Sequence, residues 1–78
     1  MPTVLREGPY RFFFYSSDGD EPLHIHVQSD AAIAKFRLDP LRYDSGAGFR
    51  PVEIRRIRGI ISKHRNAFLD AWNDHFSQ

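Results

Sequence analysis

The stretch 23–38 constrains the fold most, because polar and apolar side chains alternate along it on both sides of a short polar turn. Alternation with a period of two predicts strands that bury one face. A two-residue turn at Ser29-Asp30 would pair Ile25 with Ala34, and both strands then agree on which face is apolar. We therefore expect an antiparallel hairpin formed by strands at about 23–28 and 31–38.

The face of this hairpin opposite the core carries its reactive side chains. In the expected register, Ile25 points to the core, and His24 lies across from Lys35. His26 and Arg37 share the outer face. We therefore expect two accessible histidines beside two cations, on the side of the sheet away from any covering helix.

Aromatic residues fill the preceding segment 10–15, in which five of six positions are Phe or Tyr. Such a run predicts a strand, and its even positions, Tyr10, Phe12 and Phe14, form the better core face. Thr3–Leu5 could add an edge strand, and Leu41–Tyr43 a short strand after the hairpin.

The C-terminal third predicts a helix, with Pro51 in its first turn and Glu53 at its third position. An apolar stripe recurs every three or four residues and contains two histidines that we expect to pack at the boundary between helix and sheet. The stripe is Ile54, Ile57, Ile61, His64, Phe68, Trp72 and His75. At about 1.5 Å per residue the helix would overhang three short strands. We expect either a bend or break near 62–66 or a partner over the overhang.

The sequence thus predicts an α+β fold in a single domain, 1–78. It consists of a three-stranded antiparallel sheet, or a four-stranded one with an added edge strand, packed on one face by a long C-terminal helix. The sheet occupies about 3–43 and the helix, bent or straight, about 51–76.

Composition excludes several classes of protein. The chain has no cysteine, which excludes a disulfide framework and a zinc site built from thiolates. No apolar run approaches the roughly 18 residues of a membrane span, and the N-terminus lacks the apolar core of a signal peptide. We expect a cytoplasmic protein without membrane contact or cofactor, and a homo-oligomer is compatible with the sequence.

The net charge of +1 conceals an asymmetry. From Arg50 to Arg65 there are six basic residues against one acid, Glu53. This excess predicts a surface that attracts nucleic acid or an acidic partner, and a solvated helix face is the alternative. The residues expected to bind are Arg55, Arg56, Arg58 and Arg65, with Tyr15 available to stack on a base.

Several short motifs occur together along nearly the whole chain. They are Met1–Arg6, Gly8–Tyr15, Glu21–Val27, Ala34–Phe36, Leu38–Pro40, Gly48-Phe49, His64-Arg65 and Ala71–Asn73. In this combination the chain resembles a small bacterial family, domain of unknown function 4160. It departs from the usual family pattern at Leu23, Arg37 and Arg50, where members carry proline, an aromatic residue and serine. The loss of serine as a helix cap would cost about 1 kcal/mol.

The resemblance implies a small intracellular protein. Genes of this family often lie beside those of another short family, domain of unknown function 2442, in an arrangement like a toxin–antitoxin pair. The resemblance thereby implies a small cognate protein partner, together with an action on RNA or binding to DNA.

Three hypotheses for function remain open at this point, and with them whether the protein is an enzyme. The first is an interaction module without chemistry, in which the histidines are structural and the helix arginines bind a partner or nucleic acid. The second is metal-independent RNA cleavage, with His24 and His26 as general base and acid and with Lys35 and Arg37 stabilising the phosphorane.

The third hypothesis is metal binding through His24 and His26. Two histidines need a third ligand, which would come from Asp18, Asp20 or Glu21 in the preceding turn. The neighbouring Lys35 would oppose a cation there.

Overall fold

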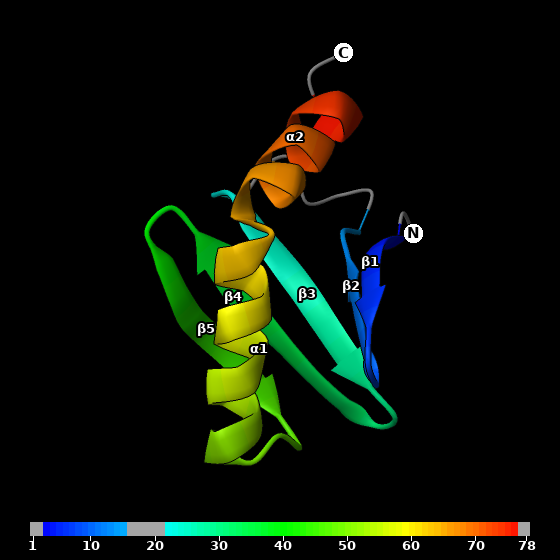
Figure 1. Ribbon diagram of the computed structural model, residues 1–78, viewed down its shortest axis with the longest axis vertical. Helices are drawn as coiled ribbons and strands as arrows, with labels where there is room; N and C mark the ends of the chain where they lie inside the picture. Colours follow the sequence, from blue (N-terminus) through cyan, green and yellow to red (C-terminus); the bar gives the residue numbers. More distant parts are fainter. Residues whose placement is uncertain (1–2, 16–21, 77–78) are drawn as a thin grey trace.

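The computed structural model describes residues 3–15 and 22–76, which form an antiparallel sheet with two helices over one of its faces (Figure 1). The strands follow one another across the sheet in chain order. They are β1 (Thr3–Glu7), β2 (Tyr10–Phe13), β3 (His24–Ser29), β4 (Ala32–Leu38) and β5 (Leu41–Ala47), followed by α1 (Pro51–Lys63) and α2 (Arg65–Phe76).

The α+β class is confirmed, whereas the predicted sheet of three or four strands and the single long helix are wrong. The sheet has five strands because both short flanking segments pair with a neighbour, β1 with β2 and β5 with β4. The helix is divided in two at His64.

The hairpin of β1 and β2 supplies the aromatic side of the core. Gly8 and Pro9 form its turn, and Gly8 adopts a φ of 58°, which glycine reaches without steric cost. In the aromatic segment 10–15, the side chains at even positions, Tyr10, Phe12 and Phe14, are buried in the core as predicted. The strand β2 itself ends at Phe13.

The hairpin of β3 and β4 turns one residue later than expected. Asp30 and Ala31 form the turn, and Asp30 adopts a φ of 52°, a conformation that aspartate tolerates better than most residues. Ile25 consequently pairs with Phe36 instead of Ala34. The predicted register is therefore wrong by two residues, but an even shift leaves every side chain on its predicted face.

The pairing of β4 with β5 contains a β-bulge. Phe36 pairs with Tyr43 and Lys35 with Ser45, so Asp44 is an extra residue on β5. Beyond the bulge the two backbones approach closely, because a Cβ at Gly46 would lie 2.7 Å from the Cα of Ala34. The bulge turns the Asp44 carboxylate toward the face of the sheet that no helix covers.

The core lies between the sheet and the two helices. Ile57 and Ile61 of α1 and Phe68 and Trp72 of α2 are its buried helical members, which confirms the centre of the predicted stripe. The buried members from the sheet side are Tyr10, Phe12, Phe14, Ile25, Val27, Ala34, Phe36 and Leu38.

The helix breaks inside the predicted interval 62–66. His64 ends α1 with a φ of −108° and a ψ of 18°. Two contacts hold this junction on the sheet: His64 Nε2 lies 3.1 Å from Oε1 of Glu7, and Arg65 Nε donates to the carbonyl oxygen of Leu38 at 2.9 Å. The break lets α2 continue past the end of the sheet while it keeps Phe68 and Trp72 in the core.

At the start of α1, a hydrogen bond between Arg50 and Glu53 takes the place of a serine cap. Arg50 occupies the N-cap position and offers no side-chain acceptor, but its backbone N–H donates to Oε1 of Glu53 at 3.1 Å. Pro51 is the first helical residue, as predicted. Within residues 3–15 and 22–76, neither helix is long and apolar enough to cross a membrane.

Candidate functional site

His24 is the first residue of β3, and its side chain is buried, with an exposed fraction of 1%. Its Nδ1 lies 2.7 Å from the carbonyl oxygen of Pro22, so Nδ1 carries the proton and donates it. The ring packs edge-on against Trp72, with 5.3 Å between ring centroids, since α2 passes the end of the sheet where β3 begins (Figure 1). The prediction that both histidines are accessible is therefore wrong for His24.

His26 lies on the same face and is half-buried among aromatic rings. Phe13 stacks on it, with ring centroids 5.5 Å apart, and Tyr15 meets it edge-on at 4.6 Å. The ring of His24 stands perpendicular to it at 5.0 Å. We call these rings, together with Trp72, the histidine cluster. It joins the uncovered face of the sheet to α2, and brings together the Glu21–Val27 and Ala71–Asn73 motifs.

The four residues predicted to be catalytic do share one face of the sheet. His26 lies opposite Lys35, and His24 lies opposite Arg37 rather than opposite Lys35 as expected. Both cations lie near one acid: Lys35 Nζ is 3.8 Å and Arg37 Nε is 3.9 Å from carboxylate oxygens of Asp44. This group can present two partly balanced cations to a phosphate, whereas His24 is buried and His26 exposes part of its ring but not its Nε2 atom.

Asp44 is the member of this group that the sequence did not reveal. It lies just beyond the short strand predicted at Leu41–Tyr43, and only the bulge turns it toward Lys35 and Arg37. The sequence holds no signal for a bulge at this position.

A metal site would need a third ligand beside the two histidines. In the part of the chain that the structure describes, no three His, Asp or Glu side chains come together in a metal-binding group. The acids predicted to complete such a site, Asp18, Asp20 and Glu21, lie outside the described residues.

The outward face of α1 carries the second predicted site. Arg55, Arg56 and Arg58 are all exposed, and Lys63, which the predicted binding set omitted, is exposed beside them. None of the four forms an ion pair or side-chain hydrogen bond with a residue in 3–15 or 22–76. We call these four residues the basic face of α1.

The remaining members of the predicted binding set lie elsewhere. Arg65 is held at the helix junction, where Nη2 lies 3.3 Å from Oδ1 of Asp39 in addition to the bond from Nε to Leu38. Tyr15, 36% exposed, belongs to the histidine cluster, on the face of the sheet opposite the helices. The predicted binding residues therefore do not form one surface.

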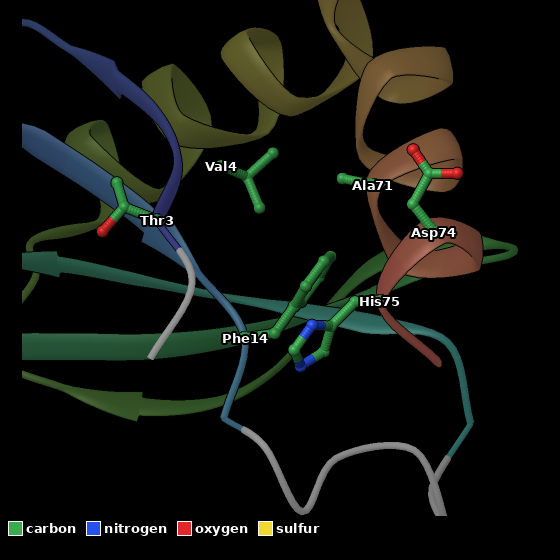
Figure 2. A pocket seen from close by; sticks show the side chains of 6 residues that line it. All are labelled: Thr3, Val4, Phe14, Ala71, Asp74 and His75. Carbon is green, nitrogen blue, oxygen red and sulfur yellow. The ribbon is translucent and has the colours of Figure 1, made fainter. Parts of the chain in front are cut away.

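A cavity of about 420 Å³ lies between the start of β1 and α2; Figure 2 shows the side chains that line it. Its lining is Thr3, Val4, Phe14, Ala71, Asp74 and His75. His75, predicted to pack at the helix–sheet boundary, is exposed at its rim. A second cavity of about 320 Å³ lies beside the turn from β3 to β4. Neither contains a residue of the predicted sites.

One comparison with known proteins gives a match. The family model described as "Domain of unknown function (DUF4160)" matches residues 10–73, which include the histidine cluster and the whole of α1. No curated protein and no solved structure matches the chain.

Proposed function

We propose that this chain, which belongs to the family Domain of unknown function (DUF4160), is a nucleic-acid-binding domain that acts inside the cell with a cognate protein partner. The observation that carries the proposal is the basic face of α1. Four exposed cations lie on three turns of one helix, and α1 contains a single acid, Glu53, which is engaged at the helix start. Such a face attracts a polyanion.

Four other cations of the chain differ from those of the basic face, because each lies near a carboxylate. Lys35 and Arg37 lie beside Asp44, and Arg50 and Arg65 each lie within 4 Å of a carboxylate. Those positive charges are partly balanced within the fold. The charge of the basic face has no such partner in the described chain, so it is available to phosphate groups, which arginine binds with paired N–H donors.

A pair of charge reversals tests the proposal. Arg55→Glu with Arg56→Glu should lower the affinity for a labelled 20-base-pair DNA duplex by at least about tenfold, measured by fluorescence anisotropy. Arg6→Glu with Arg42→Glu, two exposed cations on β1 and β5, changes the net charge equally and serves as the control. Equal affinity of both double variants, or no binding by the unmodified protein, would refute the proposal.

The partner part of the proposal concerns a toxin–antitoxin-like module. It is supported by the gene arrangement that family resemblance implies, and by the uncovered face of the sheet, where Tyr15 and Ile33 are exposed apolar side chains. Co-expression with a family-2442 protein from the same genome should give one peak in size-exclusion chromatography. Two separate peaks at micromolar concentration would count against this pairing.

A second candidate function, metal-independent RNA cleavage, is favoured by the position of His26 opposite Lys35. Cleavage of a labelled single-stranded RNA in the presence of a metal chelator should disappear in His26→Ala and decrease in Lys35→Ala. His24 is buried, so His24→Phe replaces one ring by another and should keep the packing. Cleavage by this variant would show that His26 acts without His24. An intact RNA after incubation with the unmodified protein would end this hypothesis.

A further inference from the structure

Gly59 lies in the interior of α1, where the fold has no evident need for a glycine. Its φ is not positive, it is exposed, and a Cβ placed there would meet nothing within 4 Å. Glycine in a helix interior is less stable than alanine, because it loses more backbone freedom on folding. Glycine at this position leaves the backbone of α1 open to close approach from outside the fold.

The neighbours of Gly59 on the helix surface are the cations of the basic face. Arg55 and Arg56 lie four and three residues before it, and Lys63 lies four residues after it, which are the spacings of adjacent positions on an α-helix. At 3.6 residues per turn, roughly, Val52 and Gly59 fall on one line along the helix. Val52 is exposed as well.

The cations flank this line on both sides. Stepping about 100° per residue, Arg56 and Lys63 fall on one side of the line through Val52 and Gly59, and Arg55 and Arg58 fall on the other. The outward surface of α1 is thus a strip of small, uncharged side chains between two rows of positive charge. Figure 1 shows α1 as the outermost layer over the sheet, with no other element across it.

This arrangement matches a groove that has phosphates on both walls. We propose that α1 enters the major groove of double-stranded DNA, with the Val52–Gly59 line toward the base edges and the two rows of cations toward the two phosphate strands. The inference rests on the proposed function and names its ligand. An α-helix is about 10–12 Å across, and the B-form major groove is about 12 Å wide.

Other nucleic acids fit the strip less well. The major groove of an RNA duplex is too narrow for side chains to read. Sites for single strands use aromatic side chains on which bases stack, and the outward face of α1 has none.

The test adds bulk to the floor of the strip without changing its charge. Gly59→Leu should raise the Kd for a 20-base-pair DNA duplex by about tenfold or more, because the side chain holds the helix away from the groove. Its stability toward urea should equal or exceed that of the unmodified protein, since leucine favours a helix. Asn73→Leu, on an exposed position of α2, is the matched control and should bind as the unmodified protein does.

The outcomes separate this inference from the proposed function. If Gly59→Leu binds DNA normally while the Arg55, Arg56 charge reversal does not, the groove inference fails and the proposed function stands. If Gly59→Leu weakens binding to DNA and RNA duplexes of the same sequence equally, insertion into the major groove is also refuted. If the unmodified protein binds neither duplex, the proposed function itself fails.

Discussion

At the scale of single residues, His24 and His26 share a strand and a face but not an environment. His24 donates to a backbone carbonyl and packs on Trp72, whereas His26 is half-buried between Phe13 and Tyr15. The first is therefore part of the packing between sheet and helix. The second keeps part of its ring exposed on the uncovered face of the sheet, although its Nε2 atom is buried.

This difference predicts unequal effects on stability. His24→Ala should lower the free energy of unfolding by about 2–4 kcal/mol, because it leaves a cavity against Trp72 and removes a buried hydrogen bond. His26→Ala should cost about 1 kcal/mol. Urea unfolding followed by the fluorescence of Trp72, the single tryptophan, measures both. The exposed His75→Ala is the control, and a His24→Ala variant as stable as that control would contradict the assignment.

The faces of the residues in 23–38 were predictable from sequence, and the burial of His24 was not. Alternation along 23–38 assigned each side chain to a face, and an error of two in the register did not change the assignment. The burial of His24 depends on Trp72, which is far away in sequence, and on the path of α2 past the end of the sheet. No local pattern contains that information.

At the scale of elements, the bulge in β5 is a removable feature. Asp44 interrupts an otherwise regular ladder, since Phe36 pairs with Tyr43 before it and Lys35 with Ser45 after it. Deletion of Asp44 should therefore keep both pairs and their faces. The cost should be small, because its ion pairs with Lys35 and Arg37 are partly exposed.

A second deletion provides the contrast. Deletion of Arg42 would leave Asp44 opposite Phe36 in place of Tyr43, whose ring packs edge-on against Phe36 with 5.6 Å between centroids. It should therefore lower the free energy of unfolding by more than the first deletion does, by about 1–2 kcal/mol. Urea midpoints of the two deletion variants compare them directly. Equal midpoints would mean that β5 does not hold the register seen here.

The elements differed in how well the sequence predicted them. The length of the helical segment predicted either a break near 62–66 or a partner over the overhang, and the structure shows the break, at His64. The full length of β5 could not be predicted, since Gly46 and Gly48 are typical of a loop and every residue after Leu41 in this strand is exposed. In the candidate binding site, the arginines were predictable as a charge cluster. The place of Gly59 among them was not predictable, because it depends on which side of α1 faces outward.

At the scale of the whole molecule, binding and folding should respond differently to salt. If four cations neutralise DNA phosphates, raising the salt from about 50 to 200 mM should weaken binding about 100-fold. The core is apolar and the ion pairs are partly exposed, so the urea midpoint should change little over the same range. Anisotropy titrations and urea curves in matched buffers check both. Salt-independent binding would contradict a phosphate contact.

The order of the elements also has a consequence for synthesis of the chain. Each strand pairs with the next along the sequence, so all hairpins can close locally as the chain is made from its N-terminus. Both helices follow the sheet in sequence, and until they dock, no other element within residues 3–15 and 22–76 covers the apolar face of the sheet. A chain that ends before Trp72 would lack the ring that packs against Phe14 and His24, and it would expose both to water, which favours aggregation. Trp72 therefore completes the cover of the sheet at the end where β3 begins, and this end stays open until α2 is made.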